Sequence, residues 1–599
     1  MATVSSSGSG GGGGGGVDAS DHRYDEPLLN STSTTSKLVE GVVDYRGEPI
    51  MKGSKLGGWR SASLLIGVEI CEMFAYYGVA SNLITYLTGP LRQSTTTAAE
   101  NINAWHGVVM MLPLLGAFVA DSFLGRFRTI LFSSLLYVLG LGLLTLSTVL
   151  PSLKPPVCPN NTAENNTCPS PSTFQLLFFF SSLYLVAFGR AGYKPCTEAF
   201  GANQFDGKNP EECKSLSSFF NWWALGLCLG SSISHLLLNY IQDNLSWGLG
   251  FGIPCISMAA ALLVFLLGTK TYRYSVKEDK ENPLLSIAQV FFVAAKNWRM
   301  KSSLASTHEV EIGMPHHIRV GAHQFKFLDK ALIDMSNDPV GSRKHGRSCS
   351  ISQVEDAKAV LRLVPIWFTC LIYAVVFAQS STFFTKQGNT MDRSIGPNFQ
   401  IPAASLQIFI SLSIVLFIII YDRLFVPFAR AFTGKPNGIT MLQRIGAGMF
   451  LSTISMVVAA VIEKRRLQIA LDSGLIDTPK RTVPMSVWWL VPQYVLFGLA
   501  DAFTMVGLQE FFYDQVPDEL RSVGISLFSS IFGIGSFLSG FLISVIENLT
   551  SANDLYSWFS DNLNRAHLDY FYWLLAALSA VEFAAYLYFS KSYLYKRGA

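Results

Sequence analysis

Residues 116–128 read Gly116-Ala-Phe-Val-Ala-Asp121-Ser-Phe-Leu-Gly125-Arg126-Phe-Arg128 and decide how the rest of the chain is interpreted. An apolar run ends at the aspartate, and a glycine and two arginines precede the next apolar run. Glycine permits a tight turn and the close approach of helices. Asp121 can accept a hydrogen bond from an adjacent helix end or arginine, and Arg126 can hold a neighbouring carbonyl. The stretch therefore predicts a short basic turn between two helices.

The composition around this turn is typical of a membrane protein. The chain has 599 residues, of which 50% are hydrophobic and 15% are charged, whereas an average soluble domain carries roughly 25% charged residues. So few charges could not build a water-facing surface for a chain of this length. The net charge of +3 is also too small to indicate a polyanion partner. Soluble, disordered and nucleic-acid-binding proteins are therefore disfavoured.

Twelve apolar stretches of the sequence are long enough to cross a bilayer, which takes about 20 residues per helix. They are residues 61–88, 104–121, 128–150, 174–194, 218–240, 247–268, 359–384, 403–421, 440–462, 487–509, 522–546 and 569–590. The stretches lack the alternation of a membrane β-barrel. The first follows a long polar tail and has no small-residue cleavage site after it, so it is not a cleaved signal peptide.

A long polar stretch after the sixth span divides the chain into five predicted parts. These are a disordered N-terminal tail (1–60), a first six-helix bundle (61–268), a linker (269–358), a second six-helix bundle (359–590) and a short C-terminal tail (591–599). Basic residues concentrate in the linker, the 116–128 turn and the C-terminus, which places these segments and both termini in the cytoplasm. The 463–486 loop, with Lys464, Arg465 and Arg466, is basic although this topology puts it outside.

Sequence motifs add an independent check on this orientation. Glycosylation sequons occur in loops assigned outside, at Asn160, Asn165, Asn244 and Asn548. Cys158 and Cys168 share one such loop, where a disulfide is compatible with the compartment. Asp25-Glu26-Pro27-Leu28-Leu29 is similar to an acidic dileucine sorting signal, with a chance leucine pair as the alternative. The predicted location is the plasma membrane or the vacuolar membrane, with the vacuolar membrane slightly favoured.

We single out four of the ionisable residues within or at the ends of the spans, where charges are costly and usually functional. Glu69 and Glu72 are three residues apart and share one helix face. Repulsion between them in a low dielectric favours a bound proton, as in a proton relay, whereas the alternative is pairing with cations elsewhere in the bundle. Lys194 and Glu510 close spans of opposite halves, so a bridge between them could open and close. The alternative is that both lie at the membrane interface.

The 116–128 stretch resembles the signature of the major facilitator superfamily. Five further runs resemble the plant nitrate/peptide transporter family, a branch of the proton-coupled oligopeptide transporters, and its fifth subfamily most of all. They are Glu69–Gly78, Phe219–Trp222, Tyr421–Arg423, Phe432–Pro436 and Glu510–Gln515. The resemblance covers nearly all of residues 40–597.

The resemblance implies an all-α integral membrane protein with the major facilitator fold, in which twelve helices form two six-helix bundles around a central cavity. It implies a secondary active transporter of a small solute that works by alternating access. Glu69 and Glu72 would couple protons, and Lys194 and Glu510 would serve the cavity and its gate. The resemblance also gives roles to Tyr76 and Tyr77 at the cavity wall, to Asp121, Gly125 and Arg126 in a conformational motif, and to Thr129 as a phosphorylation site. Helix packing is the alternative for the tyrosines, and a plain helix start is the alternative for Thr129.

Two positions depart from the family pattern. Met73 stands where the helix 1 motif has arginine or lysine, so the glutamates are expected to lack a counter-ion. Phe377 stands where a nitrate-transporting relative has histidine. We therefore expect nitrate or another small anion or organic solute as substrate, with proton coupling in question. The alternatives are a proton-independent facilitator or exporter of an organic metabolite or hormone, and a nutrient sensor that does not transport.

No enzyme, cofactor or metal site is predicted. The sequence shows no Ser-His-Asp arrangement, no metal-ligand cluster and no phosphate-binding glycine loop in a strand–helix context. The expected partners are a small solute or ion, protons and the lipid bilayer, without nucleic acid.

Overall fold

The computed structural model describes residues 38–593 apart from several internal segments. The segments outside it are 53, 157–169, 207–208, 276–282, 299–324, 333–348, 398, 422–424, 426, 429–430, 432–438, 480, 518–519 and 552–556. The predictions for Leu28-Leu29, Cys158, Cys168, Asn160 and Asn165 therefore lie outside the described residues.

Within the described residues, eleven helices are long and apolar enough to cross a membrane, and one bent pair of helices makes a twelfth span. The first six spans are α1 (Gly58–Ala80) with α2 (Leu83–Thr88), α3 (Thr95–Val119), α4 (Arg126–Val149), α5 (Thr173–Ala202), α6 (Pro210–Asn244) and α7 (Trp247–Leu267). A π-helical turn, η2 (Ala120–Leu124), precedes α4, and a 3-10 turn, η3 (Gly268–Lys270), follows α7. Each span coincides with one of the apolar stretches of the sequence.

The second six spans begin with the bent pair. They are α11 (Ile351–Phe368) with α12 (Leu371–Gln379) and α13 (Phe383–Asn389), η5 (Ala403–Gln407) with α14 (Ile408–Ile420), α16 (Met441–Asp472), η7 (Val487–Leu490) with α17 (Val491–Asp514), α18 (Arg521–Thr550) and α19 (Leu568–Lys591). The bend between α11 and the following pair is 49°. The predicted twelve spans are confirmed. Many helices outrun the apolar stretches because side-chain caps start them early, as Ser94 does for α3 by accepting from Thr97 N.

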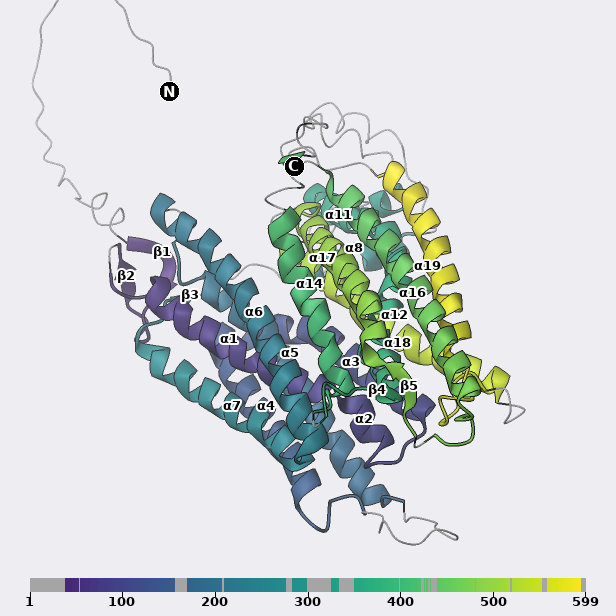
Figure 1. The fold of residues 1–599 in the computed structure, drawn as a ribbon. Coiled ribbons are helices and arrows are strands. Elements are labelled where there is room, and N and C mark those ends of the chain that lie inside the picture. The colour runs from purple at the N-terminus through teal and green to yellow at the C-terminus, as the bar shows by residue number, and fades with distance from the viewer. Residues whose placement is uncertain are drawn as a thin grey trace, which may run out of the picture.

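The two sets of spans form two bundles that lie side by side (Figure 1). A three-stranded antiparallel sheet, in the order β2-β1-β3, lies at one end of the first bundle. Its strands are β1 (Leu38–Val43), β2 (Pro49–Met51) and β3 (Tyr274–Ser275). At the same end, the linker elements α8 (Pro283–Lys296) and η4 (Leu328–Leu332) pack near α11. We call this end of the molecule the linker end.

The hairpin β1–β2 corrects the expectation that residues 1–60 are disordered. The turn between the strands is held by Asp44, whose carboxylate accepts from Arg46 N at 2.8 Å and from Glu48 N at 2.9 Å. Gly47 supplies the positive φ of 86° that the turn requires. Pairing of β1 with β3 then attaches the tail to the start of the linker.

The opposite end of the molecule carries the parallel strands β4 (Met391–Asp392) and β5 (Val483–Ser486), and we call it the β4 end. Polar bonds between the bundles gather here. Lys386 Nζ donates to Thr88 Oγ1 at 2.8 Å, and Gln407 Nε2 donates to the Ser81 carbonyl at 2.9 Å. The helices of the two bundles lean apart towards the linker end (Figure 1).

The charges of the 463–486 segment have a structural explanation. The segment was expected to be a loop, but α16 continues to Asp472. Arg466 is fully buried in this helix and forms two hydrogen bonds to the Glu463 carboxylate, at 2.6 and 2.8 Å. Arg465 lies over the Trp489 ring, 4.2 Å from its centroid. Because Arg466 is neutralised inside the protein, it does not act as a free loop charge.

Candidate functional site

The first bundle holds a buried ion pair between α1 and α5. Arg190 Nε donates to Glu72 Oε1 at 2.7 Å, and the Tyr137 hydroxyl lies 3.4 Å from the same oxygen. The Arg190 guanidinium also lies over the Tyr76 ring, 3.7 Å from its centroid, in a cation–π contact. The arginine and glutamate side chains are 6% and 0% exposed. Water has little access to this pair.

A second ion pair lies close by on the same two helices. Lys194 Nζ donates to Glu69 Oε1, and Glu69 is buried. The Lys194 side chain, in contrast, is 25% exposed. Lys194 follows Arg190 by four residues, so both cations project from one face of α5 towards the two glutamates on one face of α1. The structure therefore brings together three of the predicted residues and adds Arg190.

These pairs overturn the expectation that Met73 leaves the glutamates without a counter-ion. Each glutamate has its own cation, and both cations come from α5. Met73 is buried and faces α6, where a Cβ built on Gly230 would lie 2.7 Å from its Cβ. The pairing of the glutamates with cations elsewhere in the bundle, the alternative stated for the sequence, is the arrangement observed.

The tyrosines that follow Glu72 pack among other aromatic rings. Tyr76 is stacked with Trp105 at a centroid distance of 6.1 Å. Tyr77 meets His235 edge-on at 5.0 Å. Both tyrosines therefore pack where α1 meets α3 and α6, next to the ion pairs.

The second bundle contributes an aromatic cluster and a buried acid. Phe377 on α12 lies 5.2 Å from Phe532 and 6.0 Å from Phe497, measured between ring centroids. Asp501 on α17 accepts from the Tyr373 hydroxyl at 2.7 Å and is only 6% exposed. Among the described residues, no cation forms an ion pair with Asp501.

Another buried acid supports the bend of the seventh span. Glu582 on α19 accepts from Ile372 N at 2.6 Å and from Tyr373 N at 2.9 Å, two amides in the first turn of α12. A carboxylate at a helix N-terminus satisfies free amides and matches the helix dipole. Sequence reasoning missed Arg190, Asp501 and Glu582, although each is an ionisable residue inside a predicted span.

The structure does not bring Lys194 and Glu510 together. Glu510 lies one turn from the end of α17 and pairs with Arg444 of α16, with Arg444 Nη1 and Glu510 Oε2 3.7 Å apart. The physical reason is the arrangement of the bundles, which lean apart at the linker end where Glu510 lies (Figure 1).

The 116–128 stretch forms the predicted turn between α3 and α4. A Cβ on Gly116 would lie 2.1 Å from the Ala191 carbonyl oxygen, so only glycine allows α3 and α5 to approach this closely. Gly125 precedes α4 with φ 76°. Arg126 Nη1 lies 2.6 Å from the Asn203 side-chain oxygen in the amide orientation that satisfies both groups. The Asp121 side chain lies outside the described part of the chain.

The predicted modification sites differ in exposure. Thr129 is buried in the first turn of α4, and its hydroxyl donates to the Gly125 carbonyl at 3.0 Å. Asn244 at the end of α6 and Asn548 near the end of α18 are both exposed.

Two bundles of six spans, with ion pairs between the helices of one and a buried acid in the other, are typical of a membrane transporter. Residues 127–559 match the model of the POT family, PTR2. Protein NRT1/PTR FAMILY 5.10 of Arabidopsis thaliana is 60% identical over 560 residues, which cover 94% of this chain and 97% of the relative. The chain therefore belongs to the POT family, in the NRT1/PTR branch that the sequence resembles.

Solved structures agree on the fold. An auto-inhibited POT family peptide transporter has a TM-score of 0.67 at 21% identity and covers 89% of this chain and 97% of its own length. A POT family transporter in complex with 5-aminolevulinic acid has a TM-score of 0.59 at 17% identity and covers 89% of this chain and 96% of its own. The predicted two-bundle fold is confirmed. The relatives are transporters, in keeping with a chain that is not an enzyme.

Proposed function

We propose that the chain moves a small anionic solute across its membrane by alternating access, with a proton carried on Glu69. The observation that carries the proposal is the contrast between the two ion pairs. Arg190 and Glu72 are enclosed, whereas Lys194 is partly open to solvent while it holds Glu69. A proton on Glu69 removes the charge that holds Lys194, and the freed ammonium can bind an anionic group. Proton and anion would then enter together.

In this proposal, Glu510 is the second carboxylate with which Lys194 can pair. It lies on the other bundle, at the end where the helices lean apart (Figure 1). When that end closes, Lys194 would exchange Glu69 for Glu510 while Glu69 keeps its proton. When it opens again, Lys194 would return to Glu69 and the proton would leave. The energy of one ion pair is then replaced by that of another, which keeps the two states close in free energy.

The aromatic residues favour an organic anion. Phe377 is partly exposed and is backed by the buried rings of Phe497 and Phe532, so it offers an apolar surface in the second bundle. Asp501 adds a hydrogen-bond acceptor. A solute with an anionic group, an apolar body and a donor would match all three features. The solved relative with bound 5-aminolevulinic acid shows that this fold can hold such a molecule. Nitrate is the second candidate, supported by Lys194 alone.

Uptake into proteoliposomes tests the proposal. Nitrate, small carboxylates, and neutral and cationic solutes would be compared at two pH values, with wild type, Glu69→Gln and Lys194→Gln. Organic anions should accumulate faster with an inward proton gradient. Glu69→Gln should remove the response to pH, and Lys194→Gln should lower anion uptake by about tenfold, as expected for a lost charge-assisted contact.

Three other outcomes would contradict the proposal. If uptake by wild type did not depend on the proton gradient, the result would support a proton-independent facilitator or exporter. Uptake of neutral solutes at the same rate as anions would contradict the proposed role of Lys194 in binding the anionic group. A folded protein that moves no solute at all would support a sensor.

We further propose that the linker end faces the cytoplasm, in either the plasma membrane or the vacuolar membrane. The exposed Asn244 and Asn548 then lie on the outer or lumenal side. Removal of N-glycans should change the mobility of wild type but not of a variant with both asparagines replaced by glutamine. A fluorescent fusion with Leu28 and Leu29 changed to alanine tests the vacuolar location.

A further inference from the structure

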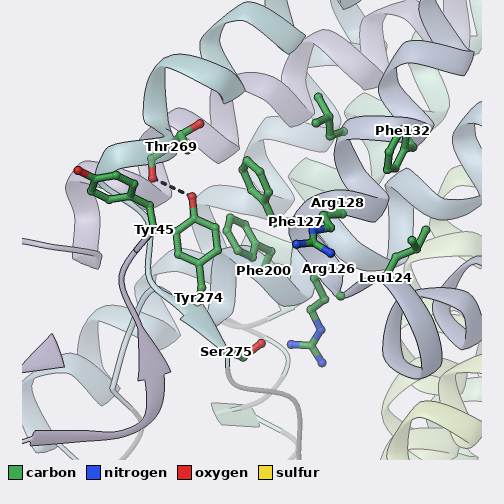
Figure 2. A pocket seen from close by; sticks show the side chains of 12 residues that line it. Tyr45, Leu124, Arg126, Phe127, Arg128, Phe132, Phe200, Thr269, Tyr274 and Ser275 are labelled. Atoms are coloured by element: carbon green, nitrogen blue, oxygen red, sulfur yellow. Dashed lines mark hydrogen bonds between the residues drawn. The ribbon is translucent and has the colours of Figure 1, made fainter. Parts of the chain in front are cut away.

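A pocket at the linker end of the first bundle has no part in the transport site described above. Its cavity volume is about 580 Å³. It is bounded by the turn after β1, the start of α4, the end of α5 and the segment η3–β3 (Figure 2). The lining residues are Tyr45, Leu124, Gly125, Arg126, Phe127, Arg128, Leu131, Phe132, Phe200, Thr269, Tyr274 and Ser275.

Positive charge gathers on one wall of the pocket. Figure 2 shows Arg126 and Arg128 beside Phe127, across from Tyr45 and Tyr274. Arg126 has Asn203 as a partner. Arg128 is exposed and forms no ion pair with any residue that the structure describes. An arginine in this setting retains its full capacity to bind an anion.

The backbone adds to this positive potential. Arg126 and Arg128 lie in the first turn of α4, which has no acidic residue and no side-chain cap. Cations at a helix N-terminus face the positive end of the helix dipole, which is unfavourable. A bound anion would relieve this repulsion and satisfy the free amides of the first turn.

The other wall of the pocket is apolar and continues along a membrane span. Phe127 stacks on Phe265 with 5.1 Å between ring centroids, and Phe132 remains exposed. Beyond Phe132, the exposed side of α4 carries only apolar residues, namely Leu135, Leu136, Leu139, Leu146 and Val149. An apolar stripe on a membrane helix faces acyl chains. The charged wall and this stripe meet at Phe132.

We propose that this pocket binds the phosphate group of an anionic phospholipid, with Arg128 as its main cation and the acyl chains along the stripe from Phe132 to Leu139. The apolar stripe decides between a lipid and a soluble phosphate, because a free anion would gain nothing from it. The site is separate from the transport site proposed above, which rests on Glu69, Lys194 and residues of the second bundle.

Native mass spectrometry of the full chain tests the site with phosphatidylglycerol and phosphatidylcholine as probes. Wild type should retain phosphatidylglycerol preferentially. Arg128→Gln should lower that retention about fivefold, the effect of one cation near anionic lipid, and Arg128→Lys should preserve most of it. Arg60→Gln is the matched control, because Arg60 is also an exposed arginine in the first turn of a span at the linker end, outside the pocket. It should leave retention unchanged.

Three results would overturn the proposal. Equal retention of the two lipids by wild type would show no preference for the anionic head group. Equal losses in Arg128→Gln and Arg60→Gln would show general surface attraction. Displacement of phosphatidylglycerol by inorganic phosphate at the same concentration would make the pocket a soluble-anion site. The first and third results concern wild type alone and decide the matter even if Arg128→Gln does not fold.

Discussion

Arg190 supplies the positive charge that position 73 lacks. It reaches Glu72 from α5, and the cation–π contact with Tyr76 fixes its orientation. The family motif places a cation next to the glutamates in sequence, whereas here the cation is next to them in space. Charge balance inside the bundle is thus kept although the motif is broken.

Met73→Arg should therefore not strengthen proton dependence. Glu72 already has a counter-ion, and position 73 faces the close contact with Gly230 on α6. A buried arginine there would lack a free acid and would repel Arg190, so we expect the protein to unfold at lower temperature. The pH profile of uptake and a thermal unfolding curve measure both effects. Met73→Leu, which conserves volume, is the control, and a steeper pH profile in Met73→Arg would refute the expectation.

The acids of this site could be predicted from the sequence, but their partners could not. Glu69 and Glu72 were found because charges inside spans are rare, and the same rule applied to every span would have found Arg190, Asp501 and Glu582. That Glu72 meets Arg190 and not Lys194 depends on how α1 and α5 are rotated about their axes. Nothing in the spacing of residues along either helix fixes that rotation.

At the scale of elements, the glycine that opens the 116–128 stretch sets the distance between α3 and α5. Gly116→Ala would place a methyl group against the backbone of Ala191. The helices would have to separate, at a cost of about 1–3 kcal/mol. Thermal unfolding of the purified variant should show this loss.

Gly67→Ala is the matched control for this prediction. Gly67 is also inside a span, but a Cβ there would meet nothing within 4 Å. Alanine favours a helix by about 1 kcal/mol over glycine, so this variant should be as stable as wild type or more stable. Equal losses in both variants would mean that glycine at 116 has no special packing role.

The start of α12 depends on a side chain from another helix. Glu582→Ala would leave the amides of Ile372 and Tyr373 without acceptors in a buried position, which costs about 1–3 kcal/mol per group. Glu582→Gln keeps one carbonyl oxygen and should lose less. Unfolding temperatures should follow the order wild type, glutamine, alanine. The reverse order of the two variants would exclude the capping role.

Hydropathy located the spans but not their ends. Apolar residues define only the part of a helix within the lipid, whereas caps such as Ser94 and buried pairs such as Glu463–Arg466 extend helices into polar sequence. The hairpin at residues 38–51 was missed because the glycine- and serine-rich residues before it predict disorder, and one short apolar stretch is too weak a signal to predict a strand after them. Its partner β3 is more than 200 residues away in sequence.

At the scale of the whole molecule, the bonds that hold the bundles together at the β4 end join residues far apart in the sequence. Lys386 meets Thr88, and Gln407 meets the Ser81 carbonyl. Lys386 is half-buried between the bundles, although lysine is usually exposed. In the proposed transport cycle such contacts exist only while the β4 end is closed, so a sequence pattern shared by all states does not reveal them.

The ion pair between Arg393 and Asp243 is one of these state-specific contacts, and its loss should shift the equilibrium between states. Arg393 Nη1 and Asp243 Oδ2 lie 3.7 Å apart, with side chains 25% and 14% exposed. A partly exposed pair is worth about 0.5 kcal/mol, so Arg393→Gln should roughly double the population closed at the linker end. Spin labels at positions 60 and 591, in a chain with its native cysteines replaced, would report this as a larger fraction of short distances.

Arg565→Gln provides the control for that shift. Arg565 pairs with Asp477, and both residues belong to the second bundle at the same end of the molecule. Because this pair does not cross between the bundles, its loss should leave the free-energy difference between the two states unchanged. The distance distribution should stay that of wild type. If both variants shifted it equally, the bonds at the β4 end would not be what holds the molecule in the observed state, and loss of surface charge in general would be the cause.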